Sequence, residues 1–168
     1  CYVELDWDSI ILPRFPLLDP GETHESQFRR ECEKGLRQHY GDDWATREIC
    51  GVNIKERFEY EYKVICDKGF AAYFLIVAEY VQWAKDNGIG VGPGRGSAAG
   101  AIVAYAMNIT AFDPLENGLM FERFLSPQRT EMPDIDMDFD DERRLEVVEH
   151  VRQLYGPCLL YTSPSPRD

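Results

Sequence analysis

The chain has 168 residues, is 44% hydrophobic and carries a formal net charge of −12. This length and apolar fraction are enough for one globular domain with a buried core. The acidic excess argues against a protein that grips DNA by itself, because contacts with phosphates require clustered lysine and arginine.

Targeting signals and paired cysteines are both missing from the sequence. No run of residues approaches the length of a membrane span, and no signal peptide is recognisable. We therefore expect a cytoplasmic protein without membrane contact. The cysteines are odd in number and scattered, without a C-x-x-C pair, which favours free thiols over disulfides or a zinc site. They are Cys1, Cys32, Cys50, Cys66 and Cys158.

Three helices are predicted in the first half of the chain, after a proline-punctuated start that suggests an edge strand or two. Apolar residues recur every four positions over residues 23–40, which is typical of an amphipathic helix. A second helix is expected over residues 53–66, with Asn53 as its N-cap. The third covers residues 71–86 and ends at Asn87-Gly88, a common C-terminal signal. Because apolar side chains surround most of this third helix, we expect it in the centre of the domain.

A glycine-rich stretch follows, with the sequence Gly92-Pro93-Gly94-Arg95-Gly96-Ser97. It lies between the short, β-capable residues 89–91 and an alanine-rich segment, residues 97–107, that predicts a helix. Glycines let backbone N–H groups approach an anion closely, Ser97 can cap the helix or donate to a phosphate, and a helix N-terminus favours negative charge. The stretch therefore predicts a polyphosphate site.

Three other interpretations compete for this stretch. A Walker A loop requires a lysine before the serine, but Gly96 is followed directly by Ser97. A dinucleotide-binding pattern matches residues 94–99, but the acidic residue near the ribose-binding distance, Asp113, lies in a turn-like segment and not at the end of a second strand. A structural turn that binds nothing remains open.

The stretch 133–139 alternates aspartate with apolar residues. In a strand, successive side chains point to opposite faces, so the apolar residues would enter a core and the aspartates would line one exposed face. Asp134 and Asp136 would have Cα atoms about 7 Å apart, a spacing from which both carboxylates can reach one metal site. Asp138 shares this face but lies another ~7 Å along the strand. A solvated acidic face is the alternative; an EF-hand fails, because Phe139 occupies the position of its glycine.

Short helical segments are expected on both sides of this acidic stretch. One starts at Asp113 and continues through residues 119–125, and the other is capped by Asp140 and Asp141 and runs to about residue 155. Arg123 and Arg129 flank the acidic stretch. There they would either meet phosphate charge or pair with nearby carboxylates.

Several blocks of sequence point to one known family when they are taken together. They are GFAAYFLIV at 69–77, DNG at 86–88, VGPGRGSAAG at 91–100, DPL at 113–115, FERFL at 121–125 and MPDID at 132–136. In this order they closely resemble the catalytic alpha subunit of bacterial DNA polymerase III, a C-family replicative polymerase. The segment LPRFP at 12–16 is similar to the segment that follows the N-terminal PHP domain in that family.

The resemblance implies a helix-rich α/β (α+β) fold, an incomplete palm domain similar to the polymerase beta nucleotidyltransferase fold. It implies that Asp134 and Asp136 are catalytic and hold two Mg²⁺ ions, with a third catalytic aspartate beyond this chain. It also implies a triphosphate site for the incoming nucleotide. The residues implied there are Gly94, Arg95, Gly96, Ser97 and Arg123.

The implied function is template-directed DNA synthesis, in which dNTPs are added to a primer 3′-hydroxyl by two-metal-ion nucleotidyl transfer. The implied partners are primer-template DNA, dNTPs and other replicase subunits, including the sliding clamp. Two alternatives remain from the residues alone: a nucleotide-sugar transferase that uses D-x-D, and a non-catalytic cation-binding domain. We expect the chain by itself to be inactive.

The expected organisation has three parts. Residues 1–22 form a linker from a missing PHP domain, residues 23–156 form the palm domain fragment, and residues 157–168 form a non-native tail with the composition of translated adapter or vector sequence.

Overall fold

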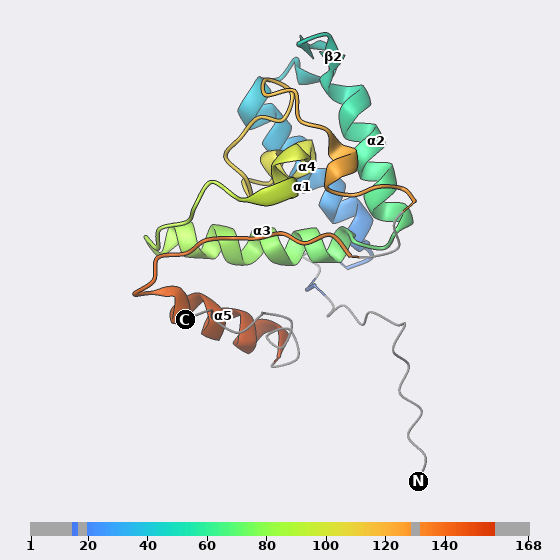
Figure 1. The fold of residues 1–168 in the computed structure, drawn as a ribbon. Coiled ribbons are helices and arrows are strands. Elements are labelled where there is room, and N and C mark those ends of the chain that lie inside the picture. The colour runs from blue at the N-terminus through green and yellow to red at the C-terminus, as the bar shows by residue number, and fades with distance from the viewer. Residues whose placement is uncertain (1–14, 17–19, 129–131, 157–168) are drawn as a thin grey trace.

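The computed structural model describes residues 15–16, 20–128 and 132–156. Within these ranges the chain is mostly helical (Figure 1). Its elements in chain order are α1 (His24–Tyr40), the 3₁₀ helix η1 (Trp44–Thr46), β1 (Glu48–Ile49), β2 (Val52–Asn53), α2 (Ile54–Asp67), α3 (Ala71–Asp86), the 3₁₀ helix η2 (Gly96–Gly100), α4 (Ile102–Ala106), the 3₁₀ helix η3 (Phe121–Arg123) and α5 (Arg144–Tyr155).

The first three helices begin and end close to where the sequence predicts. Thr23 caps α1, because its side chain accepts the N–H of Ser26 while the Ser26 side chain accepts the N–H of Thr23. Asn53 caps α2 by accepting the N–H of Glu56. α3 ends at Asp86, directly before the predicted Asn87-Gly88 signal. Each cap satisfies a backbone group that the helix leaves without a partner, so local sequence is enough to set these ends.

The helix-rich part of the predicted fold class is confirmed, but the sheet is smaller than predicted. β1 and β2 form one antiparallel pair, with Glu48 opposite Asn53. The predicted strands at residues 89–91 and 133–139 form only two isolated bridges in the described part of the chain. Val91 pairs with Phe139, and Arg95 of the glycine-rich stretch pairs with Asp136, but no continuous ladder joins the two bridges.

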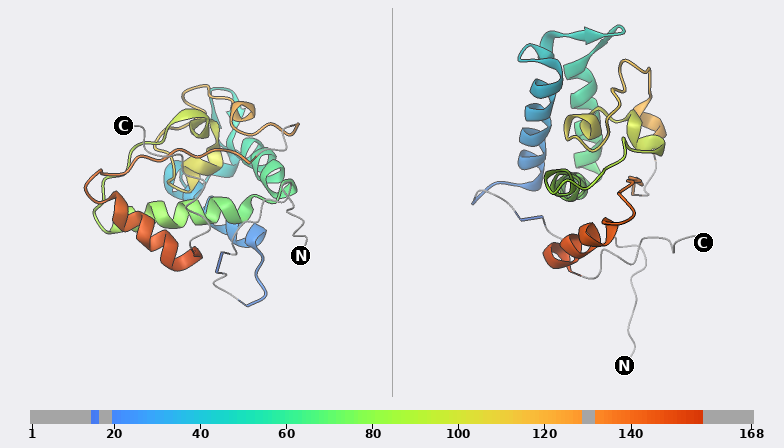
Figure 2. Two further views of the ribbon diagram at one scale, coloured as in Figure 1. Left: turned by 60° about the horizontal axis from the view of Figure 1, so that its bottom comes forward. Right: turned by 90° about the vertical axis from the view of Figure 1, so that its left-hand side faces the viewer.

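α3 lies across the middle of the molecule, with α1, α2 and α4 on one side of it and α5 on the other (Figures 1 and 2). α1 packs against both α3 and α4, α2 packs against α4, and α5 packs against α3. The prediction that α3 is central is therefore confirmed, and most of its apolar side chains are buried.

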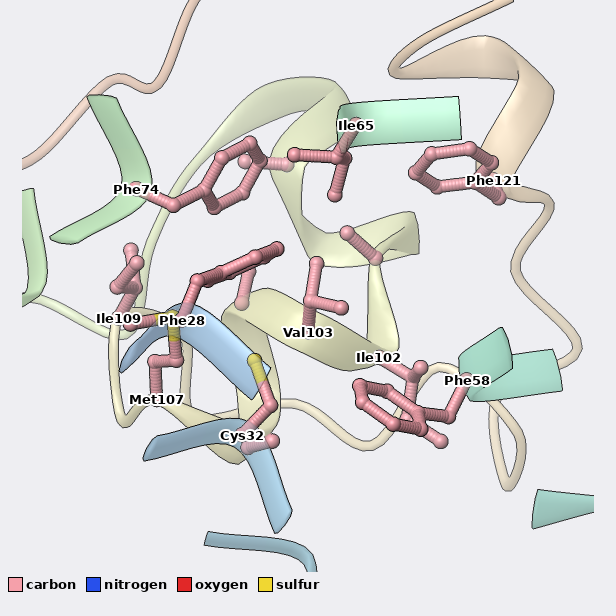
Figure 3. Close-up of a cluster of buried hydrophobic side chains, with 14 of the residues drawn as sticks. Phe28, Cys32, Phe58, Ile65, Phe74, Ile102, Val103, Met107, Ile109 and Phe121 are labelled. Carbon is pink, nitrogen blue, oxygen red and sulfur yellow. The ribbon is translucent and has the colours of Figure 1, made fainter. Parts of the chain in front are cut away.

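One main hydrophobic core holds these helices together (Figure 3). Phe28 of α1 and Phe74 of α3 meet with ring centroids 5.6 Å apart, and both are fully buried. Phe58 of α2 and Phe121 of η3 are buried in the same cluster. Burial of each such side chain contributes about 1.5–3 kcal/mol.

A second, smaller cluster attaches α5 to the C-terminal half of α3. Ala84 and Val147 are buried there, and Trp83 stacks on the His150 ring with centroids 4.1 Å apart. His150 Nε2 lies 2.8 Å from a Glu79 carboxylate oxygen. α5 therefore depends on α3 for its position.

Two predicted helical segments are shorter than expected, for the same physical reason. The Asp113 carboxylate accepts the N–H of Leu115, and the Asp140 carboxylate accepts the N–H of Glu142. These local bonds close turns, which compete with helix formation. Residues 114–118 are turns in consequence, and α5 begins only at Arg144, without a side-chain cap.

Some expectations fall on residues outside the described ranges. The edge strands near the N-terminus, Arg129 and the tail 157–168 lie there, so the linker and tail boundaries stay predictions. Cys32, Cys50 and Cys66 are free thiols, while Cys1 and Cys158 are outside the description. No helix in the described part of the chain has the length and apolar character needed to cross a membrane.

Candidate active site

The glycine-rich stretch and the acidic stretch lie side by side. The N–H of Gly92 donates to the Asp138 carbonyl at 2.8 Å, and the N–H of Asp140 donates to the Gly90 carbonyl at 2.9 Å. A third, longer contact joins the Arg95 N–H to the Asp136 carbonyl at 3.4 Å. Two segments more than 30 residues apart in the sequence are therefore held in antiparallel register.

The alternating burial predicted for residues 133–139 is present over residues 133–136, whereas residues 137–139 are all of intermediate burial. Ile135 is only 8% exposed, while Asp134 and Asp136 are exposed on either side of it. Met137 and Phe139 are partly buried against the main core. The acidic stretch thus keeps the two-faced pattern of a strand, although only its bridge residues pair as one.

The three aspartates of this stretch have different surroundings. Among the described residues, no hydrogen bond or ion pair engages the carboxylate of Asp134 or Asp136. The Asp138 carboxylate instead lies 2.5 Å from Nη2 of Arg95, and both side chains are largely exposed. Asp138 therefore differs from Asp134 and Asp136 in having an arginine partner. Arg95, which was predicted to bind phosphate, instead binds a carboxylate.

Tyr73 of α3 lies beneath the acidic pair. Its phenol lies near the backbone of Ile135, the residue between the two aspartates, and this backbone acts to lower the pKa of the phenol. Burial, followed by the nearby charges of Asp134 and Asp136, raises the pKa of Tyr73 to about 12. Further along α3, the ring of Tyr80 lies 6.1 Å from that of Phe139. α3 is therefore the support on which the acidic stretch rests, as the two segments show in Figure 1.

The helix predicted at residues 97–107 is broken into two. η2 occupies Gly96–Gly100, Ala101 is extended with φ −99° and ψ 121°, and α4 follows at Ile102–Ala106. Ser97 is exposed and does not cap a helix, because the N-cap position of η2 is Arg95 and no side chain bonds there. An anion at this loop would therefore depend on loop N–H groups and nearby side chains, not on the dipole of a long helix.

A cavity of about 430 Å³ opens beside the loop. Of the predicted triphosphate residues, Gly96, Ser97 and Arg123 line it. Arg123 is exposed, and its guanidinium has no hydrogen bond or ion pair with any described residue. The other lining residues are Ala99, Gly100, Gly118, Leu119 and Met120, none of which was named among the predicted triphosphate residues.

The remaining predicted site residues lie outside the lining of this cavity. Gly94 is buried, with φ of 91°, and a Cβ there would come within 2.8 Å of the Thr110 side chain, so its role in the structure is a tight turn. Asp136 lies next to the loop, because its Oδ2 is 3.8 Å from the position that a Cβ on Gly96 would take. The loop is therefore adjacent to the acidic stretch at Asp136.

The donor set suits a hard divalent cation but is incomplete. In the described ranges, no group of three or more histidine, cysteine, aspartate or glutamate side chains is placed to hold a metal. Asp134 and Asp136 supply carboxylate oxygens, which are the ligands that Mg²⁺ prefers, and Mg²⁺ commonly binds through one or two carboxylates with water and substrate phosphates. Two exposed carboxylates that have no partner among the described residues fit that mode of binding.

Sequence reasoning missed a buried ion pair behind the cavity. Glu61 is fully buried on α2, and its carboxylate lies 2.6 Å from Nε of Arg57. A signal was present, because Glu61 falls on the same helical face as the apolar residues Ile54, Phe58 and Ile65. A charged residue in the apolar stripe of a helix is rare unless it is paired.

Comparison with known proteins decides the family. Residues 26–161 match the family described as the bacterial DNA polymerase III alpha NTPase domain. The chain belongs to this family. Its curated relatives include DNA polymerase III subunit alpha of Mycobacterium tuberculosis, 50% identical over 145 residues, and that of Escherichia coli K12, 46% identical over 159 residues. The subunit from Aquifex aeolicus is 49% identical over 148 residues.

The chain corresponds to a small part of these relatives. The alignments cover 86%, 93% and 87% of the chain but only 12%, 14% and 12% of the M. tuberculosis, E. coli and A. aeolicus subunits, respectively. Membership in the polymerase III alpha family is thus established for nearly the whole chain.

Proposed function

We propose that this chain is part of the palm domain of a template-directed DNA polymerase, and that it supplies two catalytic aspartates and part of the nucleotide site. The observation that carries the proposal is the pairing of the glycine loop with the acidic stretch in a member of the polymerase III alpha family. That pairing puts a possible phosphate site next to two carboxylates that have no other partner. This is the arrangement that metal-dependent nucleotidyl transfer requires. A polymerase beta type of fold for the complete domain is part of the same proposal.

Asp134 and Asp136 would hold Mg²⁺, with a further carboxylate supplied from outside this chain. Bound magnesium would lower the pKa of the primer 3′-hydroxyl and stabilise the charge that develops on the phosphates. The contribution of this chain is to hold the two carboxylates on one side of the backbone. The Ile135 side chain between them is buried, which limits their movement.

The triphosphate of the incoming dNTP would occupy the cavity beside the loop. Ser97 can donate its hydroxyl hydrogen, the loop N–H groups of residues 96–97 can approach phosphate oxygens, and Arg123 can bring a positive charge. Arg95 would reach a phosphate only by leaving Asp138. We therefore place Arg123 ahead of Arg95 as the cationic partner of the triphosphate.

The proposed partners follow from the family and not from the charge of this chain. We infer that primer-template DNA and dNTPs are the substrates, and that other replicase subunits, including the sliding clamp, bind the complete protein in the bacterial cytoplasm. A net charge of −12 implies that most of the basic surface for DNA lies elsewhere in that protein.

The test is the replacement of each aspartate in a full-length alpha subunit that contains this sequence. Asp134→Asn and Asp136→Asn should each reduce primer extension to background, because the amide cannot supply the charge that holds Mg²⁺. Asp141→Asn is the matched control, since Asp141 is an exposed aspartate outside the alternating stretch and should keep near-normal synthesis. Near-normal synthesis by either Asp134→Asn or Asp136→Asn would refute the proposal.

A further inference from the structure

The ion pair between Arg57 and Glu61 has more partners than an ordinary surface pair. Both residues belong to α2, one helical turn apart, and Nε of Arg57 lies 2.6 Å from Oε1 of Glu61. Glu61 is fully buried and the Arg57 side chain is only 16% exposed. Burying two charges is costly unless their other hydrogen-bonding groups are satisfied, so the remaining partners show what the pair does.

Glu61 binds the start of α4. Its second carboxylate oxygen, Oε2, accepts the N–H of Val103 at 3.2 Å, and the backbone of Ile102 lies close enough to favour the charged form of the carboxylate. These are the first two residues of α4, whose N-cap position, Ala101, has no side chain that could bond them. Glu61 therefore does from another helix what a capping residue would do within α4.

Arg57 binds both walls of the cavity beside the glycine loop. Its Nη2 donates to the carbonyl of Gly100 at 2.8 Å and to the carbonyl of Leu119 at 3.1 Å. Gly100 ends η2, Leu119 belongs to the segment before η3, and both residues line the cavity. The two walls touch directly, because a Cβ on Gly100 would lie only 2.6 Å from the Met120 carbonyl oxygen.

We propose that Arg57 and Glu61 are positioning residues that hold the two walls of the nucleotide cavity at a set separation and thereby determine the affinity for the incoming dNTP. This rests on the proposed function only in taking the cavity as the triphosphate site. Neither residue lines the cavity, so they act through Gly100, Leu119 and the start of α4. Arg57 is suited to the role because a guanidinium presents several N–H donors in a rigid plane, which a lysine does not.

The decisive experiment is Arg57→Lys in a full-length alpha subunit that contains this sequence. The lysine keeps the charge next to Glu61 but cannot reach both carbonyls with the same geometry. We expect KM for the dNTP in single-nucleotide incorporation to rise about tenfold, the effect of one lost charge-assisted hydrogen bond, while kcat changes less than about threefold. Glu61→Gln should also raise KM, since it removes the charge that orients Arg57.

A matched pair on α1 provides the control. Nε of Arg29 lies 2.9 Å from Oε1 of Glu33, with the same spacing of four residues, but this pair is more exposed and has no contact with the cavity. Arg29→Lys and Glu33→Gln should keep the wild-type KM. If the mutations at 57 and 61 only reduced the fraction of folded enzyme, kcat would fall while KM stayed unchanged, and that result would overturn the positioning role.

Amide hydrogen exchange reports how stably the two cavity walls are held, and it does not depend on enzyme activity. In the Arg57→Lys variant, exchange should become faster in peptides covering residues 98–104 and in peptides covering residues 117–122, because both walls lose the same anchor. Unchanged exchange in either segment would contradict the proposal. The outcome is separable from that of the aspartate test: active Asp134→Asn enzyme would refute the polymerase site, whereas a wild-type KM in Arg57→Lys enzyme would refute only the role of the ion pair.

Discussion

Asp136 and Asp138 are equivalent in the sequence pattern but not in the folded chain. The Asp138 carboxylate pairs with Arg95, while that of Asp136 lies near Gly96 and has no hydrogen bond or ion pair with a described residue. The alternation of side chains correctly indicated which residues are exposed, because it depends only on backbone geometry. It could not indicate the partner of each carboxylate, since the Arg95 side chain comes from a segment 43 residues away.

Glu61 gives a prediction about pH at the scale of one residue. Burial raises its pKa from 4.5 to about 7, while Arg57 and the N–H groups of Ile102 and Val103 act in the opposite direction. Burial, followed by the charge of Glu61, raises the pKa of the Cys32 thiol on α1 well above its ordinary value. This thiol therefore stays neutral where Glu61 titrates. The folded chain therefore binds the Glu61 proton more tightly than the unfolded chain does.

The stability contributed by this proton is complete below pH 4.5 and is lost as the pH rises through about 7. Its size is at most about 3 kcal/mol, from the difference between the two pKa values. Thermal unfolding of the wild-type chain and of Glu61→Gln, followed at pH 5 and at pH 8, isolates this contribution. Relative to Glu61→Gln, the wild type should lose stability between the two pH values; a constant difference would show that the pKa of Glu61 is not raised.

At the scale of elements, helices with their own caps were predictable and segments with distant partners were not. The ends of α1 and α2 follow from Thr23 and Asn53, whose side chains bond within the next turn. The break at Ala101 has no such local cause. There, Arg57 and Glu61 bond the backbone on both sides of the break, which offsets the loss of intrahelical bonds. Tertiary contacts of this kind override helix propensity and are invisible to periodicity.

Gly35 provides a test of the packing between α1 and α4. Replacing a glycine by alanine inside a helix normally stabilises it by about 1 kcal/mol. Here an added Cβ would lie 1.7 Å from the carbonyl oxygen of Ala106, a backbone atom that cannot rotate away. Gly35→Ala should therefore destabilise the chain by about 2–3 kcal/mol in thermal or urea unfolding, the opposite sign.

The neighbouring position supplies the control for this measurement. Lys34 is exposed on the same helix, so Lys34→Ala should change the free energy of unfolding by no more than about 0.5 kcal/mol. A Gly35→Ala chain that is more stable than the wild type would mean that α1 and α4 do not approach as closely as described.

At the scale of the whole molecule, the family was predictable because several separate blocks of sequence matched it in order. The fold around the site was predictable only in part: the central place of α3 follows from its apolar composition, but the near absence of a sheet does not. The alternation in residues 133–139 does not indicate how continuous the pairing with a neighbour is, and here the pairing is limited to two isolated bridges. The described chain provides a neighbour on one edge.

The chain of 168 residues by itself should not extend a primer. Asp134 and Asp136 are exposed carboxylates of the acidic stretch, and the described residues contain no group of three acids placed to complete a metal site. The net charge of −12 also opposes binding to DNA. Primer extension with Mg²⁺ should give no product above background, while a full-length subunit containing this sequence serves as the positive control. Product from the short chain that disappears in its Asp134→Asn variant would contradict this prediction.

The one-sided backbone pairing of the acidic stretch has a consequence for how a larger protein would be assembled around it. The N–H and carbonyl of Met137 form no hydrogen bond with another described residue, whereas the carbonyls on either side of it bond the glycine loop. Met137 therefore presents a vacant donor and acceptor on the border away from the loop, where another extended segment could join by β-augmentation. Such a segment would place its own alternate side chains on the same face as the two aspartates.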